Sequence, residues 1–199
     1  MDNDVYLVTS RTTGRQILID AADDPDAISA MIADASGDGP SPEVDLIVTT
    51  HRHADHLRAL SEMAHRTGAE VAAGREDADS ITAQTGVGVA RLLDHGDRIG
   101  VEGIEMDVIG LRGHTPGSIA LAYCEPGQPV HLFTGDSLFP GGMGNTGGDP
   151  ARFSSLFADV TTRIFDRYAD DAVVHPGHGE PTTLGAERES LEQWRARGW

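Results

Sequence analysis

Four potential metal ligands fall within six residues of this chain. The segment His51–His56 carries imidazoles at His51, His53 and His56 and the carboxylate of Asp55. Imidazole and carboxylate are ligands that zinc and its first-row neighbours prefer. Alternate residues of an extended segment share a face, so we expect His51, His53 and Asp55 to point one way and His56 another. A solvated histidine patch is the alternative, but no folding requirement asks for this spacing. The segment therefore predicts a metal site, with His56 available to a second ion.

Three further potential ligands lie downstream in turn-rich loops. His114 stands in Gly-His-Thr-Pro-Gly-Ser, Asp136 in Thr-Gly-Asp-Ser and His178 in Pro-Gly-His-Gly. Glycine lets a backbone approach a metal closely or adopt positive φ. Apolar runs precede the His51–His56 segment and the loops of Asp136 and His178, and they predict buried strands. These runs are Leu46–Val48, His131–Phe133 and Ala172–Val174.

The four motifs, in this order, resemble the metal-binding motifs of the metallo-β-lactamase superfamily. The resemblance extends from about Tyr6 to about Thr183. Within the superfamily the sequence is most similar to the glyoxalase II branch, the hydroxyacylglutathione hydrolases. The resemblance implies an α/β fold, a four-layer αββα sandwich in which two mixed sheets lie face to face between outer helices. The metals would lie at one edge of the sandwich.

The resemblance also implies how the ligands are shared between two metal ions. We expect two Zn²⁺, with iron or manganese as alternatives. The implied ligands are His51, His53 and His114 for one ion, Asp55, His56 and His178 for the other, and Asp136 as the bridge between them.

β-Lactamase activity is not expected. Zinc β-lactamases of the commonest subclass have a cysteine where this chain has Asp136. The only cysteine is Cys124, which follows the apolar run Ile119–Tyr123. We expect Cys124 to be a small buried hydrophobic residue and not a ligand.

Composition restricts the class of partner. The 199 residues are enough for one domain with a substantial core, and we expect a single domain over residues 1–199. No run approaches the roughly 20 apolar residues of a membrane span, so no membrane partner is expected. The formal net charge is -17, with 32 acidic residues against 15 arginines and no lysine, which disfavours nucleic acid as a partner. The expected partner is a small-molecule substrate, and the oligomeric state stays open.

The absence of lysine has a consequence for the substrate. A carboxylate or phosphate on the substrate has to be bound by arginine, by backbone amides or by the metals. Arg152 and the amides of the Gly141–Gly148 loop are candidates. The chain has no internal disulfide, because it has one cysteine, and its start lacks the pattern of a secretory signal. Both features favour the cytoplasm.

Hydrophobic spacing and turn residues predict the elements around the motifs. A hairpin is expected first, and helices are expected after Asp-Pro pairs, where aspartate caps the helix and proline occupies its first position. The predicted segments are strands at Val5–Thr9 and Gln16–Asp20, and helices after Asp24–Pro25, from about Asp55 to about Arg66, over Ala78–Gln84, after Asp149–Pro150 and over Glu187–Arg195.

The predicted activity is hydrolysis of a small thioester. Two metals some 3.5 Å apart can hold a hydroxide between them and polarise a thioester carbonyl. We expect Asp55 to orient the hydroxide and Asp136 to bridge the metals, so both are assigned catalytic roles. No Gly-x-Ser-x-Gly segment supplies a serine nucleophile.

Two alternatives to hydrolysis remain. A mononuclear iron persulfide dioxygenase would use the same motifs, with iron at His51, His114 and Asp136. A non-catalytic metal-binding domain is the other, and the ligand set argues against it because structural zinc sites are closed and usually cysteine-rich.

The chain departs from the glyoxalase II pattern in two places. The family usually shows Gly-Cys-Gly-Arg after the bridging aspartate, whereas Gly142–Asn145 has no arginine, so a conventional glutathione site is not expected. Full-length glyoxalase II enzymes carry a further C-terminal helical domain that binds glutathione, and we expect none here, because the sequence ends at Trp199. The segment Pro140–Gly148 is either a substrate-facing loop or a plain connection. Asp20 is either a partner of a metal ligand or a loop cap. His175 is expected to be structural, although it could face the cleft.

Overall fold

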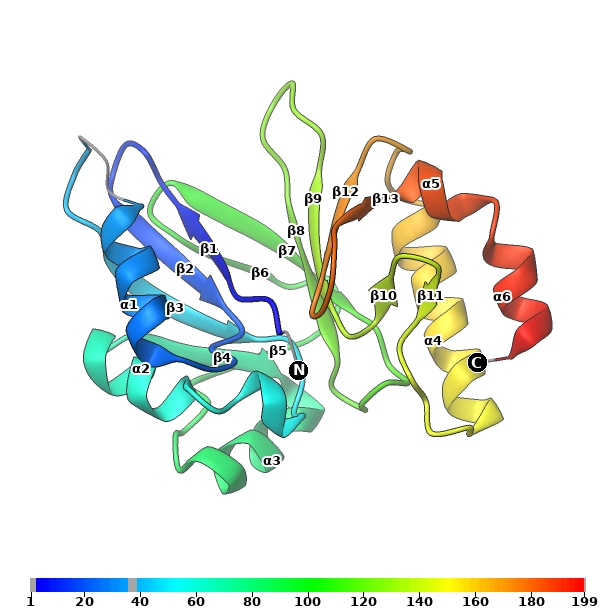
Figure 1. Cartoon of the computed structure of the whole chain (residues 1–199), viewed down its shortest axis with the longest axis horizontal. Helices are drawn as coiled ribbons and strands as arrows, with labels where there is room; N and C mark the ends of the chain where they lie inside the picture. Colours follow the sequence, from blue (N-terminus) through cyan, green and yellow to red (C-terminus); the bar gives the residue numbers. More distant parts are fainter. Residues whose placement is uncertain (1–2, 36–38, 199) are drawn as a thin grey trace.

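Two β-sheets lie face to face in the protein, as Figure 1 shows for the computed structural model, which describes residues 3–35 and 39–198. In the first sheet the strands follow the order β1-β2-β3-β4-β5. β1 and β2 form the antiparallel hairpin that the sequence predicts, and the other neighbours are parallel. Its strands are β1 (Tyr6–Thr9), β2 (Arg15–Ile19), β3 (Glu43–Thr49), β4 (Glu70–Gly74) and β5 (Arg91–Leu93).

The second sheet has the order β13-β12-β9-β8-β7-β6. It is antiparallel except for the parallel pair β9 and β12, so both sheets are mixed, as predicted. Its strands are β6 (Arg98–Val101), β7 (Ile104–Gly110), β8 (Ile119–Tyr123), β9 (His131–Gly135), β12 (Val173–Pro176) and β13 (Thr182–Thr183). A separate hairpin, β10 (Leu138–Phe139) and β11 (Gly142–Met143), follows β9.

Strand alternation builds the core between the sheets. In β2, Ile17 and Ile19 face the second sheet, while Leu18 faces the outer helices. In β8, Ile119 and Leu121 face the first sheet, while Ala120 faces the helices on the other side. Successive side chains of a strand point to opposite faces, and each fully buried aliphatic side chain contributes about 1.5–3 kcal/mol. Both faces of each sheet are therefore covered by apolar contacts.

Helices form the two outer layers (Figure 1). The first three helices pack against the first sheet through Ile28, Leu60, Met63 and Ile81, and the last three pack against the second sheet through residues that include Leu156 and Trp194. The four-layer αββα sandwich is thus confirmed. The helices are α1 (Pro25–Asp34), α2 (Leu60–Thr67), α3 (Arg75–Thr85), α4 (Pro150–Val160), α5 (Leu184–Arg188) and α6 (Leu191–Arg197).

The Asp-Pro pairs begin helices as predicted. The Asp24 carboxylate accepts a hydrogen bond from the backbone N–H of Ala27 at 3.0 Å, and Asp149 caps α4 through Ala151 and Arg152. These bonds satisfy N–H groups that have no partner inside the helix.

Two predicted helices and one burial prediction were wrong in detail. The helix expected from Asp55 is a 3₁₀ turn over Ala54–His56, and α2 begins only at Leu60, because the N–H groups of Arg58 and Ala59 donate to Ala22 and Ala21 instead of to the preceding turn. The helix expected over Glu187–Arg195 is two helices, which begin earlier, at Leu184, and end later, at Arg197.

The break between these two helices lies at Glu189–Ser190. It lets Trp194 pack into the core between the second sheet and the helices that cover it. Cys124 is exposed and not buried, because β8 ends at Tyr123 and the chain leaves the sheet there. No described helix is long and apolar enough to cross a membrane.

Candidate metal centre

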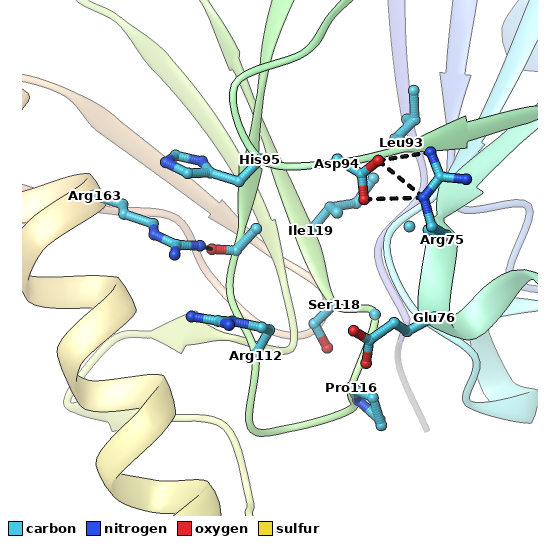
Figure 2. A pocket seen from close by; sticks show the side chains of 13 residues that line it. Arg75, Glu76, Leu93, Asp94, His95, Arg112, Pro116, Ser118, Ile119 and Arg163 are labelled. Atoms are coloured by element: carbon cyan, nitrogen blue, oxygen red, sulfur yellow. Dashed lines mark hydrogen bonds and ion pairs between the residues drawn. The ribbon is translucent and has the colours of Figure 1, made fainter.

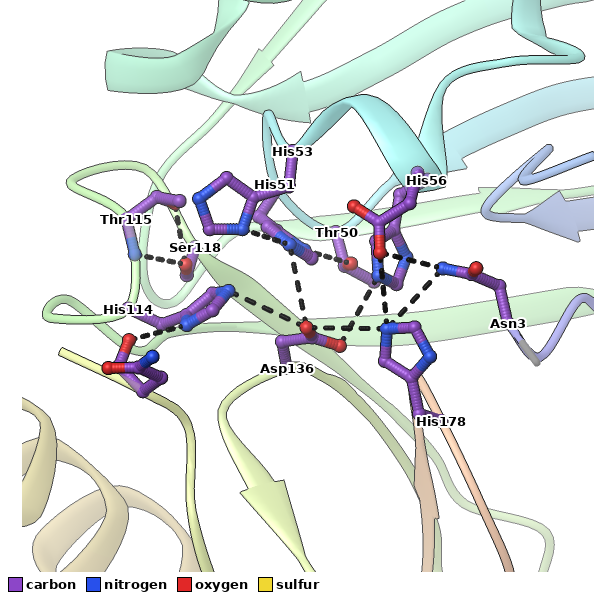
Figure 3. Close-up of polar contacts among 12 residues, drawn as sticks. Asn3, Thr50, His51, His53, His56, His114, Thr115, Ser118, Asp136 and His178 are labelled. Atoms are coloured by element: carbon purple, nitrogen blue, oxygen red, sulfur yellow. Dashed lines mark hydrogen bonds and ion pairs between the residues drawn. The ribbon is translucent and has the colours of Figure 1, made fainter. Parts of the chain in front are cut away.

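The seven predicted ligands meet at one edge of the sandwich (Figure 3). They form two groups, in each of which the potential ligand atoms lie within 4.8 Å of one another. The first group contains His51, His53, His114 and Asp136, and the second contains Asp55, His56 and His178.

Strand ends from both sheets bring these residues together. The segment His51–His56 follows β3 of the first sheet, and a backbone bond from Ile119 N to Thr50 O, at 2.9 Å, joins the end of β3 to the start of β8. In the second sheet, the parallel pairing of Pro176 with Gly135 makes β9 and β12 end side by side. Asp136 and His178 therefore emerge next to each other. A Cβ at Gly177 would collide with Asp136 and His56, so only glycine allows this approach.

Asp136 lies between the two groups. Its Oδ2 atom is 3.6 Å from His114 Nε2 and 3.5 Å from His178 Nε2, and its Oδ1 atom is 3.3 Å from His56 Nε2. His51 Nε2 is farther, at 4.0 Å from Oδ2. One carboxylate thus reaches histidines of both groups, which is the arrangement that a bridging ligand requires.

Asp20 contacts the ligand loop and is not a simple loop cap. Its Oδ1 accepts the N–H of Thr50 at 2.7 Å, and its Oδ2 accepts the hydroxyl of Thr50 at 2.7 Å and lies 3.0 Å from His56 Nδ1. The backbone of Asp20 has φ +55°, a conformation that only a supported residue keeps. The carboxylate therefore requires a proton on Nδ1 of His56, so Nε2, which faces Asp136, is the nitrogen that a metal would bind in exchange for a proton.

The same reasoning fixes two other rings. The Thr50 hydroxyl donates to Asp20, so at 3.1 Å it accepts from Nδ1 of His51. The backbone carbonyl of Asn145 accepts from Nδ1 of His114 at 2.8 Å. Both rings then present an unprotonated Nε2 to the group. Asn145 belongs to the segment Pro140–Gly148, so this segment contacts a histidine of the centre and is more than a plain connection.

Electrostatics favour a cation at this edge. Burial lowers the pKa of His51, His53 and His114, so these imidazoles are neutral at pH 7, as ligands must be. At His56, burial opposes protonation, but the carboxylates of Asp20 and Asp136 outweigh it and raise the pKa to about 10. A field that attracts a proton this strongly also attracts a metal cation.

Unsatisfied buried atoms test whether the site fits a metal. His56 Nε2, His114 Nε2 and Asp136 Oδ1 are buried and have no hydrogen-bond partner among the described residues. Such atoms cost free energy unless something binds them. All three face the space between the two groups, so the residues fit a metal centre.

Three residues support the centre through contacts that the sequence analysis did not predict. Asn3 donates to Asp55 at 3.2 Å and forms an isolated β-bridge with His178. Asp77 on α3 accepts bonds from both ligand loops. Arg152, predicted as a candidate for binding the substrate, donates to the carbonyls of Gly113 and His114 and holds that loop. A polar residue far away in the sequence carries no sign of such contacts.

A hollow of about 210 Å³ borders the Gly113–Ser118 loop, and none of the seven ligands lines it (Figure 2). Three arginines line it, and each is already paired with a carboxylate. Arg75 pairs with Asp94 at 2.6 Å, and Arg112 and Arg163 each pair with Asp159 at 3.1 Å. Asp94 and Asp159 therefore balance two of the three positive charges, and the carboxylate of Glu76 also lines the hollow.

Comparison with known proteins agrees with this geometry. The sequence profile of the metallo-beta-lactamase superfamily matches residues 2–178, and the chain belongs to that superfamily. A hydroxyacylglutathione hydrolase of Anaeromyxobacter dehalogenans is 35% identical in an alignment of 185 residues that covers 89% of this chain and 61% of that relative. The predicted resemblance to the glyoxalase II branch is thus confirmed, although the chain spans less than two thirds of that relative's length.

Two solved structures are similar over most of their length. ETHE1 from Myxococcus xanthus has a TM-score of 0.81 and 25% identity, with 98% of this chain and 80% of that one covered. TTHA1623, crystallised in a di-iron-bound form, has a TM-score of 0.69 and 31% identity, with 94% and 92% covered.

Proposed function

We propose that this protein is a metal-dependent hydrolase of small thioesters. The observation that carries the proposal is the position of Asp136, whose two carboxylate oxygens face histidines of two adjacent groups. Relatives named hydroxyacylglutathione hydrolase support the reaction type. The TTHA1623 structure, which holds two irons, supports a centre for two metals.

The proposed ligands follow the two groups. His51, His53 and His114 would hold one ion, Asp55, His56 and His178 the other, and Asp136 both. Nitrogen and carboxylate donors suit Zn²⁺, and we propose two zinc ions, with iron or manganese as alternatives. A bound metal of this kind polarises a carbonyl oxygen and lowers the pKa of a water molecule from 15.7 to about 7.

The chain's own residues orient the reaction. Asp55 Oδ2 lies 3.4 Å from His178 Nε2 and accepts a hydrogen bond from the Asn3 amide, so the carboxylate is fixed where it would orient a water molecule. Asp20, Thr50 and the Asn145 carbonyl keep a proton on Nδ1 of three imidazoles, so each of them presents Nε2 to the centre. This preorganisation lets the site stabilise charge without reorganising during the reaction.

The proposed substrate is the thioester of a small acid with a cellular thiol, such as a lactoyl conjugate. The segment Gly142–Asn145 passes close to Asp136 and His114 at Gly144 and contains no arginine, so its backbone amides are candidates for binding a charged thiol carrier. Few contacts remote from the reacting bond predict a high KM.

A panel assay tests the proposal. Purified wild type, His114→Ala and the exposed-histidine control His65→Ala are given thioesters, a β-lactam and a persulfide, with released thiol and oxygen uptake as readouts. We expect thiol release by wild type and by His65→Ala but not by His114→Ala, and no turnover of the β-lactam. Iron-dependent oxygen uptake with the persulfide and no thioester cleavage would overturn the hydrolase in favour of a dioxygenase.

A further inference from the structure

Asp77 is a completely buried carboxylate outside the predicted ligand set. It lies in the first turn of α3, and 0% of its side chain is exposed. A buried carboxylate costs free energy unless hydrogen bonds or a counter-charge compensate it. The groups that compensate Asp77 all belong to the two loops that carry histidines of the first group.

One set of contacts reaches the His51–His56 loop. The Arg52 N–H, between His51 and His53, donates to Asp77 Oδ2 at 3.0 Å, and the Arg52 side chain lies 3.7 Å from Oδ1. From the same helix, Gln84 donates to the Arg52 carbonyl at 2.9 Å. Both peptide groups that flank Arg52 are therefore bonded to α3.

The other set reaches the loop of His114. The Thr115 hydroxyl donates to Oδ2 at 2.5 Å, and the Gly117 N–H donates to Oδ1 at 3.0 Å. Ser118 completes the turn through the N–H of Thr115. A Cβ at Gly117 would collide with Asp77, so the loop lies directly on the carboxylate. One side chain thus joins the backbones next to three of the predicted ligands.

We infer that Asp77 is a positioning residue of the metal centre, whose carboxylate holds His51, His53 and His114 in one geometry. The inference rests on the metal centre of the proposed function. The effect of Asp77 should be selective for the first group, because its contacts lie beside the ligands of that group. Asp20 and Asn3 instead contact His56 and Asp55 of the second group. Removing the carboxylate should therefore weaken one metal and not the other.

Metal titration of four variants tests this inference. Asp77→Asn keeps the shape of the side chain but replaces one carboxylate oxygen by an NH2 group, which cannot accept a hydrogen bond from a backbone N–H. Thr115→Val removes the hydroxyl that contacts Asp77 and Ser118, and Thr115→Ser restores it. Asp79→Asn alters an exposed carboxylate of the same helix. Zn²⁺ is competed against a chromophoric chelator, and the visible spectrum of Co²⁺-loaded protein reports ligand geometry.

We expect Asp77→Asn to weaken one of two metal equivalents by about 10–100-fold, the usual effect of removing a partner outside the ligand shell. The other equivalent should be unchanged, the Co²⁺ spectrum should shift, and kcat should fall more than KM rises. Thr115→Val should show a smaller effect of the same kind. Thr115→Ser and Asp79→Asn should match wild type.

Equal weakening of both metals, or wild-type affinities with only a lower melting temperature, would overturn the positioning role. If Asp77→Asn does not fold, the comparison of Thr115→Val with Thr115→Ser decides. A wild type that binds metal but cleaves no thioester would defeat the proposed function and leave this test intact, since the titration needs no turnover.

Discussion

At the scale of single residues, the centre is set by hydrogen bonds that fix the proton on each imidazole. Three rings donate from Nδ1 to an oxygen, so their Nε2 atoms share one space with Asp136. The motif spacing predicted which side chains would meet. It left Asp20 as either a partner of a ligand or a loop cap and did not predict the role of Thr50, since Asp20 is 30 residues away from Thr50.

Replacement of Asp136 by alanine tests the bridge. We expect the variant to lose at least one metal equivalent, because no described carboxylate replaces one that faces both groups. Metal content per protein, measured by elemental analysis after dialysis, is the readout. Asp94→Ala, at an exposed position, serves as the control. An unchanged metal content in Asp136→Ala would show that Asp136 does not bridge.

At the scale of elements, the sequence predicted the strands and the capped helix starts well, because these depend on short-range alternation and on Asp-Pro pairs. It failed at the start of α2 and at the break between α5 and α6. There, backbone groups bond to distant segments, as Arg58 and Ala59 do to Ala22 and Ala21. Likewise, α3 was predicted but not its contact with both ligand loops, because that contact depends on the sandwich.

Neighbouring strands β9 and β12 also carry a histidine pair outside the centre, which gives a pH-dependent stability. His131 Nδ1 and His175 Nε2 are 2.8 Å apart, and His175 stacks on Phe133 and meets Tyr6 edge-on. Burial, and then His131, lower the pKa of His175 below 6.5. The unfolded chain therefore binds this proton more readily, so the stability is present above about pH 6.5 and lost as the pH falls below it.

Melting temperatures of metal-free protein between pH 8 and pH 5 check this. On acidification the wild type should lose more stability than His175→Gln. The extra loss in the free energy of unfolding is about 1.4 kcal/mol for each unit by which the pKa of His175 differs between the folded and unfolded states. His65→Gln, at an exposed histidine of α2, should follow the wild type. Parallel pH curves for wild type and His175→Gln would contradict the assignment.

At the scale of the whole molecule, charge is the dominant property. With 32 acidic residues and 15 arginines, 17 carboxylates have no balancing cation, and they repel one another across the surface. The exposed ion pairs, such as Arg98 with Glu105, contribute only about 0–1 kcal/mol each. Repulsion among the unbalanced carboxylates should therefore outweigh them.

Added salt should for this reason stabilise the protein. Raising KCl from about 0.1 M to about 1 M shortens the screening length from about 10 Å to about 3 Å. We expect the melting temperature of metal-free protein to rise over this range, with KCl and NaCl giving similar curves. A fall in melting temperature would mean that the ion pairs outweigh the repulsion.

The ligands of the centre come from both sheets, and this has a thermodynamic consequence. His51–His56 extends from β3, whereas Asp136 and His178 extend from β9 and β12, so each proposed ion would have ligands from both sheets and would cross-link the two halves of the sandwich. Through linkage, free metal at 100 times its dissociation constant adds about 2.7 kcal/mol to the free energy of unfolding. The metal supply of the cell would then set how firmly the two halves stay together, as well as how many molecules are active.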